Sequence, residues 1–221
     1  MGEKLELTAE DGHRLQAYLA RPVGPPRGGL VVCQEIFGVN HHIREVADGY
    51  AESGYLAIAP ALFDRLRPGV ELEYNADDVA EGRALKTATA WDQAVTDIGA
   101  AAARAAEAGK VGVVGYCWGG SLAWLAACRL PVAAAVGYYG GQIHEHREED
   151  PGCPVMLHFG ERDSMIPPEH VEAIGARHPE VEIFTYPAGH GFNCRPRADF
   201  EPESAALAFE RTLAFLRRHL G

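Results

Sequence analysis

The fold of this chain is decided by residues 111–120, which read VGVVGYCWGG. The run begins as an apolar stretch typical of a buried strand. It then places Cys117 between Gly115 and Gly119, and an apolar helical stretch follows. Glycines on both sides let strand and helix approach closely, while the central residue is held in a strained turn. This pattern predicts a nucleophile elbow, with the Cys117 thiol at a sheet edge and at a helix N-terminus, where negative charge is favoured.

Outward from this stretch, strand and helix patterns alternate. Apolar runs predict strands at 29–33, 55–59, 110–115, 132–136, 155–159 and 181–186. Helical periodicity predicts helices at 76–108 (with a break), 121–129, 168–177 and 203–219. Alternating runs at 3–7 and 13–19, around an Asp-Gly turn, predict an N-terminal antiparallel hairpin. We therefore expect an α/β protein with a mainly parallel sheet and helices on both faces.

Length and charge limit the classes of partner. The 221 residues are expected to form one domain, 1–221, and the net charge is −11. An acidic surface disfavours nucleic acid and anionic membranes as partners, but it is compatible with a small anionic substrate. The N-terminal segment lacks the apolar region of a signal peptide, and no apolar stretch has the length of a membrane span.

Cysteine usage points to a reducing compartment. The five cysteines are scattered, odd in number and without CxxC spacing. This pattern disfavours a disulfide framework and a zinc site, so we expect a cytoplasmic protein without metal or cofactor. Cys33, Cys128 and Cys153 are interpreted as core or near-core thiols.

His190 is the expected general base. It lies in a glycine-flanked loop, Gly189-His190-Gly191, after the last predicted strand. Hydrolases built on this architecture order their triad as nucleophile, acid and histidine, with the histidine after the last strand. An imidazole can take the thiol proton and later deliver it to the leaving group.

Asp163 is the expected third member. It follows the apolar strand 155–159 in a loop that begins at Gly160. A carboxylate there would hold the imidazole tautomer and stabilise the imidazolium. Glu161 is the competing carboxylate, and either residue is compatible with a solvated loop charge. Together with Cys117, these residues predict a thiol hydrolase.

The segment after the first parallel strand is expected to complete the site. The backbone N–H groups of Ile36 and Trp118 are candidates for an oxyanion hole. The neighbouring Glu35 is unusual there, because a carboxylate repels a developing oxyanion. It is either a helix cap, a solvated charge or a group that contacts the thiol itself.

Other histidines are weaker candidates. His41 and His42 are adjacent, so both cannot point the same way. His144 and His146, in a charged loop, form only a weak metal-binding pattern.

Taken together, several segments resemble the dienelactone hydrolase family (carboxymethylenebutenolidases). The resemblance runs from about Leu15 to the C-terminal helix. The segments that carry it are QEIFGVN at 34–40, GYCWGG at 115–120, GYYG at 137–140, Asp163, and GHGF at 189–192. The first two are specific in combination.

The resemblance implies an α/β-hydrolase fold without a lid domain, usually a monomer, with a Cys-Asp-His triad at Cys117, Asp163 and His190. It also implies that Glu35 hydrogen-bonds the resting thiol until substrate binding helps to form the thiolate, and it assigns the oxyanion hole to Ile36 and Trp118. The implied reaction opens an enol-lactone of the dienelactone type to maleylacetate, in the breakdown of aromatic compounds.

The chain departs from the family pattern at the substrate carboxylate. Family members hold that carboxylate with two arginines. The first is expected at Arg83, while the second matches Cys194, with Arg195 one residue further on. A different ester, thioester or lactone is therefore an alternative substrate. A non-catalytic thiol sensor with the same fold is a third interpretation.

Overall fold

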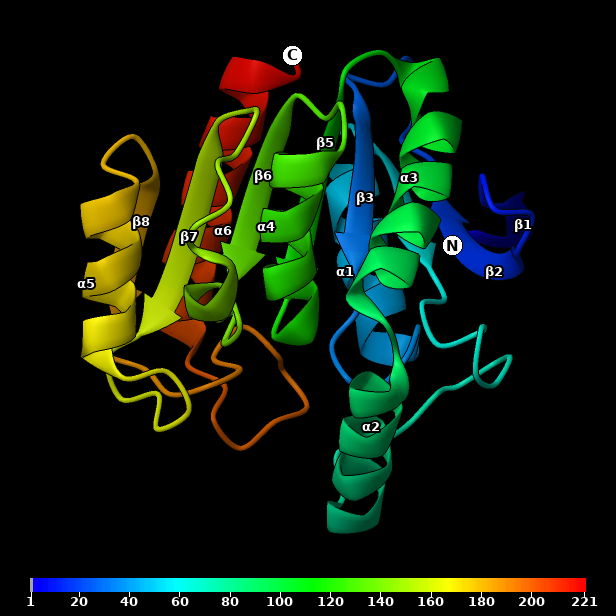
Figure 1. Cartoon of the computed structure of the whole chain (residues 1–221). Coiled ribbons are helices and arrows are strands. Elements are labelled where there is room, and N and C mark those ends of the chain that lie inside the picture. Colours follow the sequence, from blue (N-terminus) through cyan, green and yellow to red (C-terminus); the bar gives the residue numbers. More distant parts are fainter. Residues whose placement is uncertain (1) are drawn as a thin grey trace.

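An eight-stranded sheet forms the centre of the protein in the computed structural model, which describes residues 2–221 (Figure 1). The strands occur in the order β1-β2-β4-β3-β5-β6-β7-β8. Strands β3 to β8 run parallel, whereas β2 pairs antiparallel with both β1 and β4. Their bounds are β1 Glu3–Thr8, β2 Arg14–Ala20, β3 Gly29–Cys33, β4 Leu56–Pro60, β5 Val111–Tyr116, β6 Ala134–Tyr138, β7 Val155–Gly160 and β8 Glu182–Tyr186.

Helices cover both faces of this sheet. Helices α3, α4 and α5 lie on one face, and α1 and α6 lie on the other (Figure 1). Every residue of β3, β4, β5, β6 and β7 is buried, as expected for strands covered on both sides. The predicted α/β-hydrolase fold and the N-terminal hairpin are thus confirmed. The helix bounds are α1 His41–Glu52, α2 Ala76–Ala88, α3 Trp91–Ala105, α4 Trp118–Arg129, α5 Pro168–Arg177 and α6 Pro202–His219.

Some boundaries differ from the expected ones. The long helical stretch 76–108 breaks at Thr89 and Ala90, which adopt extended backbone and separate α2 from α3. Helix α4 begins at Trp118 rather than at residue 121, since both glycines of its first turn are helical. Strand β6 begins two residues later than expected, because its first residue paired with β5 is Ala134.

Helix α1 was not expected from the sequence. It begins after Asn40, whose side chain accepts a hydrogen bond from the Ile43 N–H at 3.2 Å. Its buried face includes Ile43, Ala47 and Tyr50, spaced three or four residues apart. This cap and this spacing are recognised signals for an amphipathic helix.

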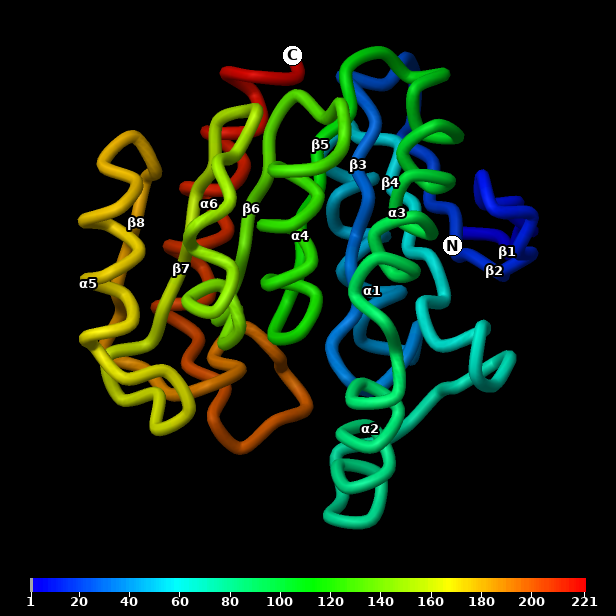
Figure 2. The backbone as a smooth tube through the Cα atoms, viewed as in Figure 1, coloured from blue at the N-terminus to red at the C-terminus, as the bar shows by residue number. Residues whose placement is uncertain are grey.

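The carboxyl ends of the parallel strands share one edge of the sheet. The loops that leave β3, β5, β7 and β8 gather there, at the bottom of Figure 2, and the orange segment around 187–201 runs beneath this edge. Helix α2 projects past the same edge (Figure 1). Polar loop residues that are distant in sequence therefore meet at one place. Across residues 2–221, no helix has the length and apolar character needed to cross a bilayer.

Candidate active site

Cys117 occupies the turn between β5 and α4. Its φ of 54° and ψ of −117° lie in a region that non-glycine residues seldom adopt. A Cβ atom at Gly115 would lie only 1.9 Å from the Gly119 carbonyl oxygen, so only glycine allows this close turn. The Cys117 N–H donates to the Tyr138 carbonyl at 3.0 Å. The turn is therefore anchored to β6, and the thiol is left half-buried at the loop edge.

Three of the predicted side chains form one hydrogen-bonded row. The Nδ1 atom of His190 lies 2.7 Å from Oδ2 of Asp163, and its Nε2 atom lies 3.2 Å from the Cys117 Sγ atom. With Nδ1 donating to the carboxylate, Nε2 can accept the thiol proton or donate to a thiolate. His190 and Asp163 are both buried. The geometry brings a thiol, an imidazole and a carboxylate together in the order in which the sequence predicts them.

Contacts between two loops hold Asp163 and His190 in place. The Arg162 N–H donates to the Ala188 carbonyl at 2.9 Å, which ties the loop after β7 to the loop after β8. Gly160 lies against the same carbonyl, since a Cβ there would come within 2.4 Å of its oxygen. The second carboxylate oxygen of Asp163 accepts from the Met165 N–H at 2.8 Å. Both acceptor atoms of Asp163 are therefore satisfied.

Glu161, the competing carboxylate, lies away from the imidazole. It is exposed, and its Oε1 atom accepts from the Thr185 hydroxyl at 3.2 Å. The hydrogen bond to His190 is made by Asp163.

The charges around His190 change its proton affinity. Burial by itself lowers the pKa of His190, but the Cys117 thiolate and the Asp163 carboxylate outweigh burial and raise the pKa to about 10. The imidazolium form is therefore favoured when the thiol is ionised.

Two backbone N–H groups are available next to the thiol. Within residues 2–221, neither the Ile36 amide nor the Trp118 amide donates a hydrogen bond. Trp118 is the first residue of α4, where backbone donors lack partners inside the helix. A Cβ at Gly119 would lie 2.4 Å from the Cys33 carbonyl oxygen, so the elbow packs closely on the turn that carries Ile36. This proximity makes a two-donor anion site geometrically feasible.

Glu35 differs from the expected arrangement. It is fully buried, yet neither carboxylate oxygen has a hydrogen-bond partner among residues 2–221, so the expected hydrogen bond to the Cys117 thiol is not present. The thiol faces His190 instead, because Nε2 offers a better acceptor at 3.2 Å. Burial raises the pKa of Glu35, and the nearby Arg197 guanidinium offsets only part of this effect.

The arginines named from the sequence do not enter the site. The side chains of Arg83 and Arg195 are both exposed, Arg83 on α2 and Arg195 in the loop after β8. Arg197 turns inward instead: its Nη1 atom lies 3.9 Å from Oε1 of Glu35, and its guanidinium packs over Gly191. Two successive turns explain this, since the Cys194 N–H donates to the Gly191 carbonyl and the Arg197 N–H donates to the Cys194 carbonyl.

The remaining candidates are distributed as follows. His144 stacks on His170 with ring centroids 3.8 Å apart, and His146 lies beside Trp91, so the two do not converge on one point. Cys33 is fully buried, and Cys128 and Cys153 are half-buried, in line with core or near-core thiols.

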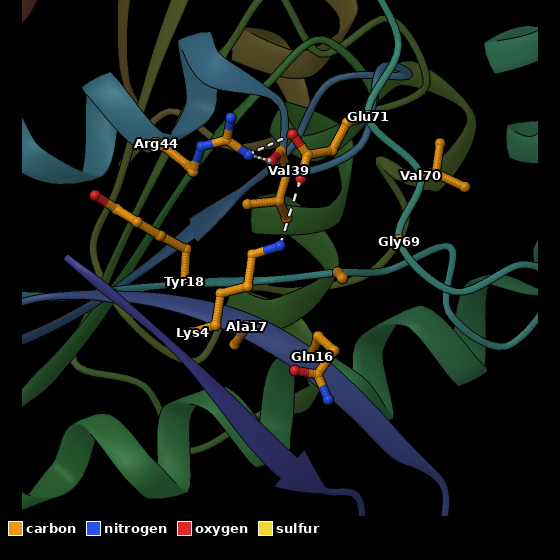
Figure 3. Close-up of a pocket in the computed structure, with 10 residues that line it drawn as sticks. Lys4, Gln16, Ala17, Tyr18, Val39, Arg44, Gly69, Val70 and Glu71 are labelled. Atoms are coloured by element: carbon orange, nitrogen blue, oxygen red, sulfur yellow. Dashed lines mark hydrogen bonds and ion pairs between the residues drawn. The ribbon is translucent and has the colours of Figure 1, made fainter. Parts of the chain in front are cut away.

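A separate hollow lies between the N-terminal strands and the segment 69–71. Its volume is about 70 Å³, and Glu71 spans it with ion pairs to Arg44 at 2.6 Å and to Lys4 at 3.8 Å (Figure 3). Ligand pockets usually have volumes of about 300 Å³ or more. None of the predicted site residues lines it. We therefore assign it no substrate.

Comparisons with known proteins show the family of this chain. A family model described as "Dienelactone hydrolase family" matches residues 15–220. The chain is 36% identical to the carboxymethylenebutenolidase of Pseudomonas putida over 227 residues, which cover 97% of this chain and 95% of that protein. It is 32% identical to carboxymethylenebutenolidase 1 of Cupriavidus pinatubonensis over 227 residues, a match that covers 98% of this chain and 97% of that protein.

A solved structure supports the same relationship. A protein of Klebsiella pneumoniae subsp. pneumoniae, assigned provisionally as a dienelactone hydrolase, matches with a TM-score of 0.84 and 32% identity. The match covers 99% of this chain and all of that one. Both the fold and the order of its elements are therefore shared over the full length.

Proposed function

Because this chain belongs to the dienelactone hydrolase family and is a carboxylic ester hydrolase, we propose that it opens a lactone or ester through nucleophilic attack by Cys117. One observation carries the proposal: the hydrogen-bonded row of Asp163, His190 and Cys117, with separations of 2.7 and 3.2 Å. The row contains the nucleophile, the base and the orienting carboxylate that acyl transfer needs.

In the first step, the Cys117 thiolate attacks the substrate carbonyl carbon and forms a C–S bond. The carbonyl oxygen becomes an oxyanion, for which the free N–H groups of Ile36 and Trp118 are the proposed donors. When the intermediate collapses, the C–O bond to the leaving oxygen breaks. The His190 imidazolium donates its proton to that oxygen. In a lactone the leaving oxygen stays tethered, so the ring opens on the enzyme.

In the second step, water cleaves the thioester. Neutral His190 takes a proton from water as the oxygen attacks the acyl carbon, and the C–S bond then breaks to release the carboxylic acid. The Cys117 thiolate that leaves and the His190 imidazolium that now carries the proton from water together restore the starting enzyme. Asp163 keeps Nδ1 protonated throughout, so Nε2 always faces the reacting atoms.

The substrate we propose is an anionic lactone of the dienelactone type, which gives maleylacetate in the breakdown of aromatic compounds. Arg197 supports this choice, because its guanidinium is half-buried and lies near Cys117 and Glu35. A guanidinium can hold a carboxylate in bidentate geometry. The reducing cytoplasm is the proposed compartment, since all five cysteines are free thiols. We expect a monomer.

Replacement of the nucleophile tests the proposal. Cys117→Ala should lower turnover of activated esters and lactones by about 10⁴-fold or more. The matched control is Cys128→Ser, which removes a half-buried thiol near the other end of α4 and should leave turnover unchanged. Mass spectrometry with a slow ester should detect an acyl adduct on the Cys117-containing peptide. Retained turnover in Cys117→Ala would contradict the mechanism, and wild-type protein without turnover or adduct would favour a thiol sensor.

Substrate choice is tested separately. The wild-type kcat/KM for a dienelactone should exceed that for neutral aryl esters by about 10²-fold or more. Equal values would assign the enzyme to another ester, thioester or lactone, while the thiol mechanism would stand.

A further inference from the structure

Three buried side chains with metal-binding atoms meet beside the candidate active site. Glu35 follows β3, His42 lies in the first turn of α1, and Cys194 lies in the loop after β8. One ligand atom from each lies within 4.8 Å of the ligand atoms of the other two. The residues are 0%, 3% and 0% exposed. The site thus joins three segments that lie far apart in the sequence.

Three polar atoms of this cluster lack hydrogen-bond partners. Both carboxylate oxygens of Glu35 and the Nε2 atom of His42 are buried without a hydrogen bond within residues 2–221. Buried polar atoms are nearly always paired, because an unpaired one loses its hydration without compensation. Here one carboxylate oxygen of Glu35, one ring nitrogen of His42 and the Cys194 Sγ atom lie within 4.8 Å of one another. A single bound group that pairs with all of them would remove this penalty.

We propose that Glu35, His42 and Cys194 form a binding site for a borderline-soft divalent cation such as Zn²⁺. Carboxylate, imidazole and thiolate are the three ligand types that Zn²⁺ binds in proteins. A thiolate and a carboxylate also balance the two positive charges, so the occupied site is neutral in a buried environment. Without a cation, the Arg197 guanidinium, 3.9 Å from Glu35, supplies one positive charge to the two acidic groups of the cluster.

The distances require only small movements. Zinc bonds to nitrogen, oxygen and sulfur are about 2.0–2.3 Å long, which places tetrahedral ligand atoms about 3.5 Å apart. Ligand atoms within 4.8 Å can reach this spacing by side-chain rotation. The Tyr74 hydroxyl lies beside Cys194 and accepts a hydrogen bond from the Asn40 amide at 3.1 Å. Zinc ions held by three protein ligands take a water molecule or a substrate as the fourth ligand.

The site differs from the hydrogen-bonded row that we propose for catalysis. Cys117 and His190 already satisfy each other at 3.2 Å, and neither belongs to the cluster. The inference therefore stands on geometry and unpaired atoms and does not depend on the proposed reaction.

Titration of the chelator-treated, full-length protein with Co²⁺ tests the site. We expect one equivalent to bind and to produce a thiolate-to-cobalt charge-transfer absorption, and Zn²⁺ should displace the cobalt. Cys194→Ser should abolish this absorption and weaken Zn²⁺ binding by at least about tenfold, since a thiolate ligand is lost. His42→Gln should weaken Zn²⁺ binding by a similar factor but retain the thiolate-to-cobalt absorption, because Cys194 is still present.

The matched control is Cys117→Ser, which removes the other thiol at this edge and should leave stoichiometry and absorption unchanged. Far-ultraviolet circular dichroism verifies that each variant is folded, and His42→Gln replaces Cys194→Ser if the latter does not fold. Two results would overturn the proposal: no stoichiometric binding to the wild-type protein, or an absorption that disappears in Cys117→Ser and persists in Cys194→Ser. The second result would locate the metal on the Cys117–His190 pair.

Discussion

Two neighbouring groups of side chains at the same sheet edge differ in how their polar atoms are paired. In the first, which we call the paired row, Asp163, His190 and Cys117 are joined by hydrogen bonds. In the second, which we call the unpaired cluster, Glu35 and His42 are buried and carry polar atoms without hydrogen-bond partners. Cys194 completes that cluster.

The difference shows two ways of using buried charge. The paired row holds a carboxylate, an imidazole and a thiol in fixed geometry, so its groups are oriented before any ligand arrives. The unpaired cluster keeps similar groups without internal partners, which lowers stability until another group satisfies them. The hydrogen bonds of the first group are therefore expected to support catalysis. The missing hydrogen bonds of the second group are expected to favour ligand binding.

The largest expected effect comes from breaking the paired row at its carboxylate. Asp163→Asn should lower kcat by about 10³–10⁴-fold, because the imidazole loses the group that fixes its tautomer and stabilises its charge. Steady-state kinetics on an activated ester measures the loss. The control is Glu161→Gln, two residues away and exposed, which should retain wild-type rates. If the two variants exchanged these outcomes, the orienting carboxylate would be Glu161.

A smaller effect is expected from Arg197, which lies between the two groups. Arg197→Met should lower kcat/KM for an anionic lactone by about 10–100-fold and change the value for a neutral aryl ester only a few-fold, because only the anion loses a charge partner. Arg195→Met and Arg83→Met are the controls, since both side chains are exposed. A larger loss in either control than in Arg197→Met would restore the original assignment from the sequence.

The pH profile examines the charge of the paired row. Because the pKa of His190 is raised to about 10, its imidazolium persists below that pH and is lost above it. The leaving oxygen needs this proton, so kcat/KM should fall about tenfold per pH unit above about pH 10. Asp163→Asn removes a charge that raises this pKa, and it should move the alkaline limb to lower pH. A wild-type limb near the ordinary histidine value of about 6.5 would contradict the ion pair.

The smallest effect concerns stability in the unpaired cluster. In metal-free buffer, Glu35→Gln should raise the free energy of unfolding by about 1 kcal/mol, equivalent to about 2–4 °C in Tm, because a neutral amide replaces a buried carboxylate that has no hydrogen bond and only a long ion pair, 3.9 Å, with Arg197. Thermal melting measures the change. Asp97→Asn provides the contrast: Asp97 is equally buried but accepts two hydrogen bonds from Arg65, so this variant should melt at a lower temperature. Destabilisation by Glu35→Gln would contradict this expectation, because the ion pair with Arg197 would then outweigh the cost of the buried charge.

The parts of the fold that could be predicted depend on short-range signals. The glycines around Cys117 require a close turn, and the apolar runs on either side of it are long enough to identify strands. Chain order then placed Asp163 and His190 at the same edge, since parallel strands all end there. Each of these inferences uses residues within one strand and its following loop.

The parts that could not be predicted depend on loop geometry and on contacts between distant segments. Arg197 rather than Arg195 turns inward because two successive turns reverse the loop, and residue counting cannot supply that direction. The unpaired cluster draws its ligand-type residues from three separate segments, so no local metal-binding spacing marks it. Helix α1 was missed although Asn40 and the spacing of its apolar residues carry the signal.

Helix α2 has a consequence for protein engineering. Gly82 is its one buried residue, and a Cβ there would lie 2.2 Å from the Ile36 carbonyl oxygen. The other α2 side chains are exposed or half-buried at the edge where the strands end. Val79 and Leu85 also pack against the core. Libraries that randomise only the exposed positions of α2 and keep Gly82, Val79 and Leu85 should therefore preserve expression while they vary the surface at the edge that carries Cys117, which makes this helix a starting point for directed evolution of substrate range.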